Sequence, residues 1–313
     1  MILQQVSSNG WELISFDVST AFLHGDGDGR LLGIHPPPEL REALGMSETD
    51  QCSLEGGAYG RVDAPYLWYC KFRDTLIAEG FYQCPLDPCV FTLATKDSKG
   101  QLRIHGSIGI HVDDGIGGGD HVFLASLQKI KSKFNFGSFE KGSFTFTGIR
   151  FQQWDDKSIE YDQVDYIDKI APLEIPKHRR NQPQSSITAA ETTQLRSLVG
   201  ALQYAAVHTR PDLSAKVGEI QSCVPKAMVS DLISANKVLH EAKVNKVSLM
   251  TVPIAPSQVT FCAFSDASFL SGREKFAHQG GLIFATTPEL LENRRAVVAP
   301  VAWISKKDRK SVV

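Results

Sequence analysis

Short apolar runs rich in β-forming residues divide the first half of the chain. Each run is bounded by glycines or by polar residues that favour turns, such as the glycines at 25, 27 and 29. Runs of this length and composition, closed by turn signals, are typical of strands. The pattern predicts strands over residues 11–22, 89–94, 102–112 and 144–153.

Two segments between these runs have the period of an amphipathic helix. Over 65–79, apolar side chains recur every four residues, after a proline suited to a first turn and before a glycine suited to a left-handed stop. In the second segment Asp120 suits an N-cap, and the apolar stripe that follows it predicts a helix. This stripe consists of Phe123, Leu127, Ile130 and Phe134.

A polar stretch separates the second half of the chain from the first. Residues 176–186 contain no apolar side chain between Pro176 and Ile187, which predicts a linker. Beyond it, the patterns of 194–207 and 231–244 indicate helices. Three β-rich runs follow, at 259–265, 281–286 and 298–305.

Length and composition indicate how many domains the chain has and limit the kinds of partner that it can bind. A chain of 313 residues exceeds what one core usually organises, so two or three domains are expected. With 42% hydrophobic and 22% charged residues it resembles folded globular proteins. A net charge of −2 excludes binding of nucleic acid over the whole surface, because phosphate contacts need clustered lysine and arginine. Any such contact is expected to be local.

Cysteine spacing and the N-terminal segment indicate the cellular compartment of the protein. The six cysteines lack the short paired spacings of zinc sites or disulfide frameworks, so reduced thiols are expected. The N-terminus lacks a basic stretch followed by a long apolar run, and nowhere do eighteen apolar residues follow one another. The sequence predicts a soluble intracellular protein without membrane contact.

Carboxylates inside apolar runs are the main candidates for chemistry. Asp113 and Asp114 end one β-rich run and precede a glycine, and Asp17 is a lone charge inside another run. Three converging carboxylates would form the pair of divalent-metal sites used for in-line phosphoryl transfer. The alternatives are an ordinary Asp-Asp-Gly hairpin turn and a strand-end cap at Asp17.

Several motifs resemble the reverse transcriptase region of copia-type retrotransposon Pol polyproteins. The matching segments occur in the family's order: F-D-V-x-T-A-F-L-x-G at 16–25, A-Y-G-x-x-x-A-P-x-x-W-Y at 58–69, H-V-D-D at 111–114, F-T-G-I-R-F at 146–151, L-R-S-L-V-G-A-L-Q-Y at 195–204, T-R-P-D-L at 209–213, F-S-D-A-S at 264–268 and W-I-S-K-K at 303–307. Their number and order make chance similarity improbable.

The resemblance implies an α+β fold of the right-hand polymerase type. A palm with a mixed or antiparallel sheet and helices is expected over residues 1–160, with its fingers largely missing. A helical thumb or connection is expected over 161–257, followed by the truncated start of a ribonuclease H-like domain over 258–313.

The resemblance also assigns roles to single residues. Asp17, Asp113 and Asp114 are expected to bind two Mg²⁺ ions, with Mn²⁺ as a substitute, and the Val18 carbonyl to complete one shell. Phe22 occupies the steric-gate position, where its ring would crowd a ribonucleotide; a core aromatic is the alternative. Implied partners are an RNA template, a DNA primer and deoxynucleoside triphosphates. The location that the resemblance implies is a cytoplasmic particle or the nucleus. The oligomeric state is not indicated.

The resemblance gives Gly148 a role as well. Gly148 would lie in the primer-grip hairpin, which would place its backbone in the substrate-binding surface. A β-bulge is an equally good explanation for a glycine between two β-rich halves.

Three departures from the family limit the expected activity. Asp63 stands where the family has a glutamine, either placing an acid near the nucleotide or capping a helix. Only ten residues precede Trp11, so the cationic fingers are expected to be absent. Asp266 alone matches the ribonuclease H acids, so no nuclease activity is expected.

The sequence therefore predicts an RNA-directed DNA polymerase that extends primers poorly or not at all. A catalytically dead, domesticated fragment that binds nucleic acid or protein is the alternative. A two-metal nuclease centred on Asp266 is a third hypothesis.

Overall fold

The computed structural model describes residues 1–27, 29–271 and 276–308. The chain forms two compact units. Trp11–Lys141, with Ile2, make up the first, here called the 11–141 unit. The second comprises Met1, Leu3–Gly10 and Gly142–Val313 and is called the 142–313 unit.

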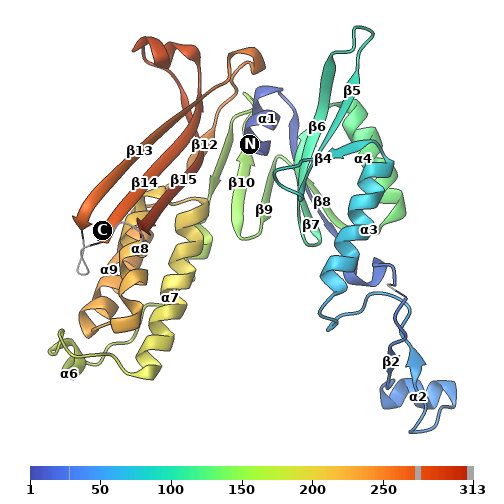
Figure 1. The fold of residues 1–313 in the computed structure, drawn as a ribbon, viewed down its shortest axis with the longest axis horizontal. Helices are drawn as coiled ribbons and strands as arrows, with labels where there is room; N and C mark the ends of the chain where they lie inside the picture. The colour runs from blue at the N-terminus through green and yellow to red at the C-terminus, as the bar shows by residue number, and fades with distance from the viewer. Residues whose placement is uncertain (28, 272–275, 309–313) are drawn as a thin grey trace. The chain divides into compact units, whose positions relative to one another are not determined.

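A six-stranded sheet in the order β4-β5-β6-β7-β1-β8 forms the centre of the 11–141 unit (Figure 1). Its strands are β1 (Glu12–Val18), β4 (Phe81–Gln83), β5 (Val90–Lys96), β6 (Leu102–His111), β7 (Asp114–Gly119) and β8 (Phe136–Lys141). Every neighbouring pair is antiparallel. The strand nearest the N-terminus therefore lies between two strands from much later in the chain.

Helices α3 (Ala64–Ala78) and α4 (His121–Lys133) supply the other layer of this unit's core. The predicted stripe of α3 is buried, with Trp68 only 1% exposed. At α4 the Asp120 carboxylate accepts hydrogen bonds from the backbone N–H groups of Val122 and Phe123, at 2.9 and 3.3 Å. Both predicted helices are confirmed, and so is the predicted cap.

Strand β7 is rich in glycine because the space around it leaves no room for side chains. An added Cβ on Gly117 would lie 2.2 Å from the Ser107 carbonyl oxygen of neighbouring β6. At Gly119 a Cβ would lie 2.3 Å from the ring of Phe123 on α4. The glycines thus let α4 and the adjacent strand approach β7 closely.

The loop region between β1 and α3 carries several short elements. They are the 3-10 turn η1 (Ala21–His24), β2 (Gly33–Ile34), α2 (Pro38–Leu44) and β3 (Cys52–Ser53), with β2 and β3 paired. No residue of α2 is buried, so this helix leaves no apolar stripe in the sequence and was not predicted. Helix α1 (Ile2–Ser8) was also not predicted.

The 142–313 unit begins with a four-stranded antiparallel sheet in the order β12-β11-β10-β9. Its strands are β9 (Ser143–Phe146), β10 (Ile149–Gln153), β11 (Ile159–Asp162) and β12 (Leu249–Thr251). The predicted single strand over 144–153 is wrong, because the chain reverses at Thr147 and Gly148. Both residues have positive φ angles, +47° and +77°, as a tight hairpin turn requires.

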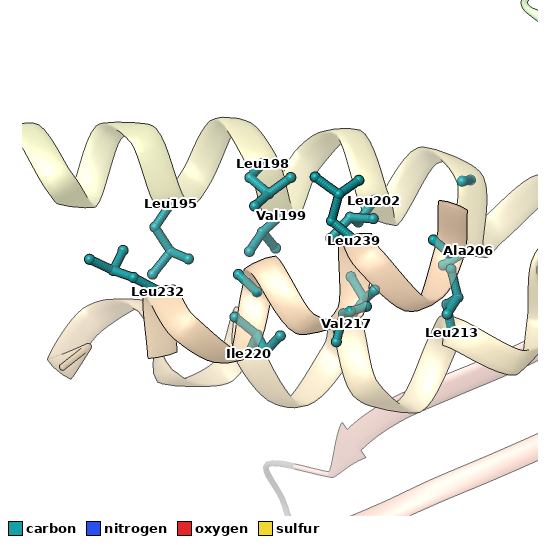
Figure 2. Packing of buried hydrophobic residues seen from close by; sticks show 14 of the residues in the cluster. Leu195, Leu198, Val199, Leu202, Ala206, Leu213, Val217, Ile220, Leu232 and Leu239 are labelled. Carbon is teal, nitrogen blue, oxygen red and sulfur yellow. The ribbon is translucent and has the colours of Figure 1, made fainter. Parts of the chain in front are cut away.

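Three helices form the main core of this unit: α7 (Ala189–His208), α8 (Ser214–Cys223) and α9 (Val229–Val244). Figure 2 shows leucine, valine and isoleucine side chains of the three helices meeting between them. The predictions for 194–207 and 231–244 are confirmed, whereas α8 was missed. Shorter elements complete this region: α5 (Val164–Asp168), α6 (Lys177–Arg180), η2 (Pro211–Leu213) and η3 (Val224–Lys226).

A three-stranded antiparallel sheet, β13-β14-β15, follows the helices. Its strands are β13 (Thr260–Ser271), β14 (Phe276–Thr286) and β15 (Val298–Asp308), with η4 (Pro256–Gln258) and η5 (Pro288–Glu292) beside them. The indole N–H of Trp303 on β15 donates to the Ala206 carbonyl of α7 at 2.7 Å. The three predicted strands are confirmed. Residues 272–275 and 309–313 of the expected ribonuclease H start lie outside the described part of the chain.

The domain bounds at 160 and 257 stay predictions. Within 176–186, the segment predicted to be a linker, Arg179 makes an ion pair with Glu191 of α7 at 2.7 Å. None of the helices in the described ranges has both the length and the hydropathy that crossing a bilayer requires.

Candidate metal centre

A two-residue turn between β6 and β7 carries two of the predicted acids. His111 pairs with Asp114, which leaves Val112 and Asp113 at the tip of the hairpin. Val112 has a φ angle of +59°, in the left-handed region that β-branched residues avoid. A strained residue of this kind costs about 1–3 kcal/mol and persists only where neighbouring groups fix it.

Two hydrogen bonds fix this turn from different elements. The backbone N–H of Val18 on β1 donates to the Asp113 carbonyl at 2.9 Å. The indole N–H of Trp68 on α3 donates to the Val112 carbonyl at 2.7 Å. Two successive carbonyls are therefore held, and the strained conformation is stabilised from both sides.

The third acid comes from the neighbouring strand. Asp17 lies directly opposite Asp114 across the β1–β7 ladder, and opposed residues of an antiparallel pair point to the same face of a sheet. The β1–β8 register shifts between Asp17 and Val18, a bulge that re-aims side chains at the strand end. One carboxylate oxygen from each of Asp17, Asp113 and Asp114 lies within 4.8 Å of the other two.

The three acids repel one another. Burial and then the Asp113 carboxylate raise the pKa of Asp17. The pKa of Asp114 is raised by burial first, and then by Asp113 and Asp17. A cation placed among them would remove this repulsion.

This donor set fits a divalent ion that prefers oxygen ligands. All three side chains are partly exposed, so an ion can reach them from solvent. On β8, an added Cβ at Gly137 would lie 2.6 Å from an Asp17 carboxylate oxygen, so the glycine keeps this side of the acid open. In the described ranges, no other three His, Cys, Asp or Glu side chains come together in this way.

Replacing Asp114 with asparagine is expected to stabilise the ion-free protein, because it removes a charge that burial disfavours first and the Asp113 and Asp17 carboxylates disfavour next. The expected gain is about 1 kcal/mol, the size of the repulsion between two charges roughly 5 Å apart in a water-like medium. Because the pKa of the Asp114 carboxyl is raised in the fold, its ionisation opposes folding. The gain should be present at pH 7 and should shrink as the pH falls through the raised pKa. Urea denaturation in EDTA measures it.

The matched control is Asp26→Asn, which removes an exposed carboxylate that pairs with Lys71 at 2.8 Å. Loss of a surface ion pair changes stability by about 1 kcal/mol at most and in the opposite direction. An Asp114→Asn protein no more stable than the wild type would contradict the repulsion.

Val18 and Phe22 follow Asp17 along the chain. Val18 is 1% exposed, and its backbone N–H is the group that holds Asp113. The half-buried ring of Phe22, on η1, packs against the ring of Tyr59 with centroids 5.3 Å apart. Gly57 lets the loop before Tyr59 approach the backbone of Phe22, because a Cβ there would lie 1.9 Å from the Phe22 carbonyl oxygen.

Asp63 is paired with two cations that sequence reasoning missed. Arg61 donates to it at 2.7 and 2.8 Å, and Arg30 also forms an ion pair with it. The hydrogen bond from Arg61 is the largest cause that lowers the pKa of Asp63. The alternative of a helix cap is wrong, because the side chain makes no capping hydrogen bond although Asp63 immediately precedes α3. The carboxylate is engaged by the two guanidinium groups instead.

Gly148 and Asp266, the remaining predicted site residues, belong to the 142–313 unit. Gly148 lies in the β9–β10 turn rather than in a bulge, and the Tyr204 hydroxyl of α7 donates to the carbonyl of the preceding Thr147. Asp266 is exposed on β13 and accepts a hydrogen bond from the Ala267 N–H at 2.9 Å. It borders a cavity of about 380 Å³ with Lys216, Glu219 and His278. Sequence reasoning offered no role for Tyr204.

Comparisons with known proteins identify the family of the chain. Residues 1–175 match the family described as "Reverse transcriptase (RNA-dependent DNA polymerase)". The chain is 27% identical over 239 residues to the "Retrovirus-related Pol polyprotein from transposon TNT 1-94" of Nicotiana tabacum, which covers 70% of the chain and 17% of that polyprotein. It is also 27% identical over 307 residues to the "Putative transposon Ty5-1 protein YCL074W" of Saccharomyces cerevisiae, covering 93% of the chain and 92% of that protein.

The fold is also found among solved structures. One of them is described as "Structure of the foamy viral protease-reverse transcriptase in complex with RNA/DNA hybrid" and matches with a TM-score of 0.51 at 13% identity. The match covers 96% of this chain and 34% of the viral one. The expected combination of antiparallel sheets and helices is therefore confirmed.

Proposed function

Because the chain belongs to the reverse transcriptase (RNA-dependent DNA polymerase) family, in the form found in copia-type retrotransposon Pol polyproteins, we propose that Asp17, Asp113 and Asp114 form its polymerase centre. The observation that carries this proposal is the meeting of three carboxylates within 4.8 Å at a strained, doubly anchored turn. The substrates proposed are an RNA template, a DNA primer and deoxynucleoside triphosphates.

The acids would hold two Mg²⁺ ions, or Mn²⁺ in their place. When bound, such ions activate the attacking hydroxyl and stabilise the charge of the leaving group. The chain's own contribution is to place the ligands: β1 supplies Asp17, and the β6–β7 turn supplies the other two acids. Because the turn is anchored before any ion binds, little reorganisation is needed during the reaction.

Phe22 is proposed to select deoxynucleotides by crowding the 2′-hydroxyl of a ribonucleotide. Replacing Phe22 with alanine is expected to reduce the preference for dTTP over UTP by about 10-fold or more, the scale on which an apolar pocket discriminates. Steady-state incorporation of both nucleotides measures the preference. Leu23→Ala, on the same turn but 54% exposed, is the control and should leave the preference unchanged. Equal preferences in wild type and Phe22→Ala would contradict the assignment.

Asp63 is proposed to slow the enzyme by engaging cations that would otherwise meet the triphosphate. Replacing it with glutamine, the usual family residue, should release Arg30 and Arg61 from the carboxylate. We expect the KM for dTTP to fall by about 10-fold, because charge-assisted contacts to phosphate are strong. The control is Asp74→Gln, which removes the carboxylate that pairs with Arg73 at 2.8 Å. This substitution should leave the KM for dTTP unchanged. An unchanged KM in Asp63→Gln would rule out this role.

Primer extension tests the proposed function. The whole chain, at a concentration above that of a poly(A)·oligo(dT) substrate, is incubated with dTTP and Mg²⁺ or Mn²⁺, with and without EDTA. We expect slow extension that EDTA abolishes. No extension with either ion would overturn the catalytic proposal and favour a non-catalytic fragment that binds nucleic acid or protein.

A further inference from the structure

The anchoring of the catalytic turn points to a residue whose role lies outside the three acids. We propose that Trp68 is a positioning residue: its indole N–H holds the β6–β7 turn in the conformation that brings Asp113 and Asp114 to Asp17. This inference rests on the proposed function of the three acids. It concerns how their geometry is maintained, and it assigns Trp68 no direct contact with substrate or ion.

The first argument is the strain of the turn. Val112 is held at a φ angle of +59°, which a β-branched side chain disfavours. The Val112 carbonyl accepts the hydrogen bond of the indole N–H at 2.7 Å, and the next carbonyl, that of Asp113, accepts one from the Val18 N–H at 2.9 Å. If the indole bond is lost, only one of the two peptide groups stays fixed. The unfixed group can then rotate to relieve the strain, and the Asp113 side chain moves with it.

The second argument is the rigidity of the donor. The indole of Trp68 is 1% exposed, and aromatic rings surround it. The ring centroids of Phe72, Phe134 and His24 lie 5.0, 5.2 and 6.0 Å away. A ring packed on these sides cannot swing to follow the turn, so it defines where the Val112 carbonyl lies. The packed position of α3 thereby fixes the position of the turn that carries Asp113 and Asp114.

The experiment compares two tryptophans that make the same hydrogen bond. Trp303 donates to the Ala206 carbonyl at 2.7 Å in the 142–313 unit, as Trp68 does to Val112 in the 11–141 unit. Each is replaced in the whole chain by phenylalanine and, separately, by 3-benzothienylalanine, which keeps the bicyclic shape and replaces the N–H by sulfur. Mn²⁺ affinity is measured by electron paramagnetic resonance, a readout that does not require turnover. The part of the Mn²⁺ binding that is lost in Asp113→Asn is assigned to the centre.

Both substitutions at Trp68 are expected to weaken Mn²⁺ binding at the centre by about 10-fold, the scale of one buried hydrogen bond. The same substitutions at Trp303 should change it by less than about twofold. If Trp68→Phe fails to fold, the benzothienyl variant decides, because it preserves the packing. Wild-type affinity in the benzothienyl variant at Trp68 would overturn the positioning role while leaving the proposed function intact. If the wild type shows no binding that Asp113→Asn removes, both proposals fail.

Discussion

Replacing Gly117 with alanine is expected to destabilise the 11–141 unit by about 3 kcal/mol or more, the upper end of the overpacking range. The added Cβ would lie 2.2 Å from the Ser107 carbonyl oxygen and 2.8 Å from the Ile108 Cα. Both are backbone atoms of β6 in the middle of the sheet, so neither can move without breaking the ladder. Urea denaturation followed by circular dichroism measures the loss.

Gly200 on α7 provides the matched control. No atom lies within 4 Å of an added Cβ there, and the residue is exposed inside a helix. Alanine at this position should stabilise the protein by about 0.5–1 kcal/mol, because it has the higher helix propensity. Similar effects of the two glycine substitutions would contradict the packing described for β7.

Replacing Asp113 with asparagine is expected to lower the rate of primer extension by about 1,000-fold or more. A loss of this size corresponds to about 4 kcal/mol of transition-state stabilisation, which is typical when a preorganised electrostatic contact is removed from a catalytic centre. Asparagine keeps the size of the side chain and its hydrogen-bonding capacity, so the change is chiefly one of charge. Single-turnover extension in Mn²⁺ measures the rate.

Asp97→Asn is the control for this charge change. Asp97 lies in the β5–β6 turn, at the opposite end of β6 from the β6–β7 turn, and accepts hydrogen bonds from the Lys99 and Gln101 N–H groups. Its replacement should leave the rate within about twofold of the wild type. A rate in Asp113→Asn close to that of Asp97→Asn would contradict the catalytic assignment.

The elements with a clear period were predictable from the sequence. Helix α3 was found because Trp68, Phe72 and Leu76 repeat every four residues and are all buried. Strand β6 was predicted because its apolar run ends at the Asp-Asp-Gly turn. In both cases local pattern and tertiary packing select the same structure.

Other elements were missed for physical reasons. The turn at Thr147 and Gly148 interrupts an apolar run without proline or a polar cluster, so one strand was predicted where two exist. Helix α8 is a ten-residue segment whose buried apolar residues, Val217 and Ile220, are too few to give a period. A short pattern of this kind does not distinguish a helix from an irregular segment.

The candidate centre was only partly predictable. Its three acids stand in recognisable motifs, but their convergence depends on β1 lying next to β7, a pairing of distant segments. From the sequence alone, Trp68 could not be distinguished from an ordinary core residue, because a sequence does not show where an indole N–H points. Of the two cations around Asp63, Arg30 was missed because it comes from a loop 33 residues away.

Diffraction from crystals soaked in Mn²⁺, with data collected at the manganese absorption edge, tests most directly whether Asp17, Asp113 and Asp114 form a metal centre. Anomalous difference maps locate bound manganese without reference to activity. The expected result is a peak within coordination distance, about 2.0–2.6 Å, of carboxylate oxygens from the β6–β7 turn and β1, absent from Asp113→Asn crystals. Manganese bound only elsewhere at a saturating concentration, or no peak among the three acids, would contradict the account.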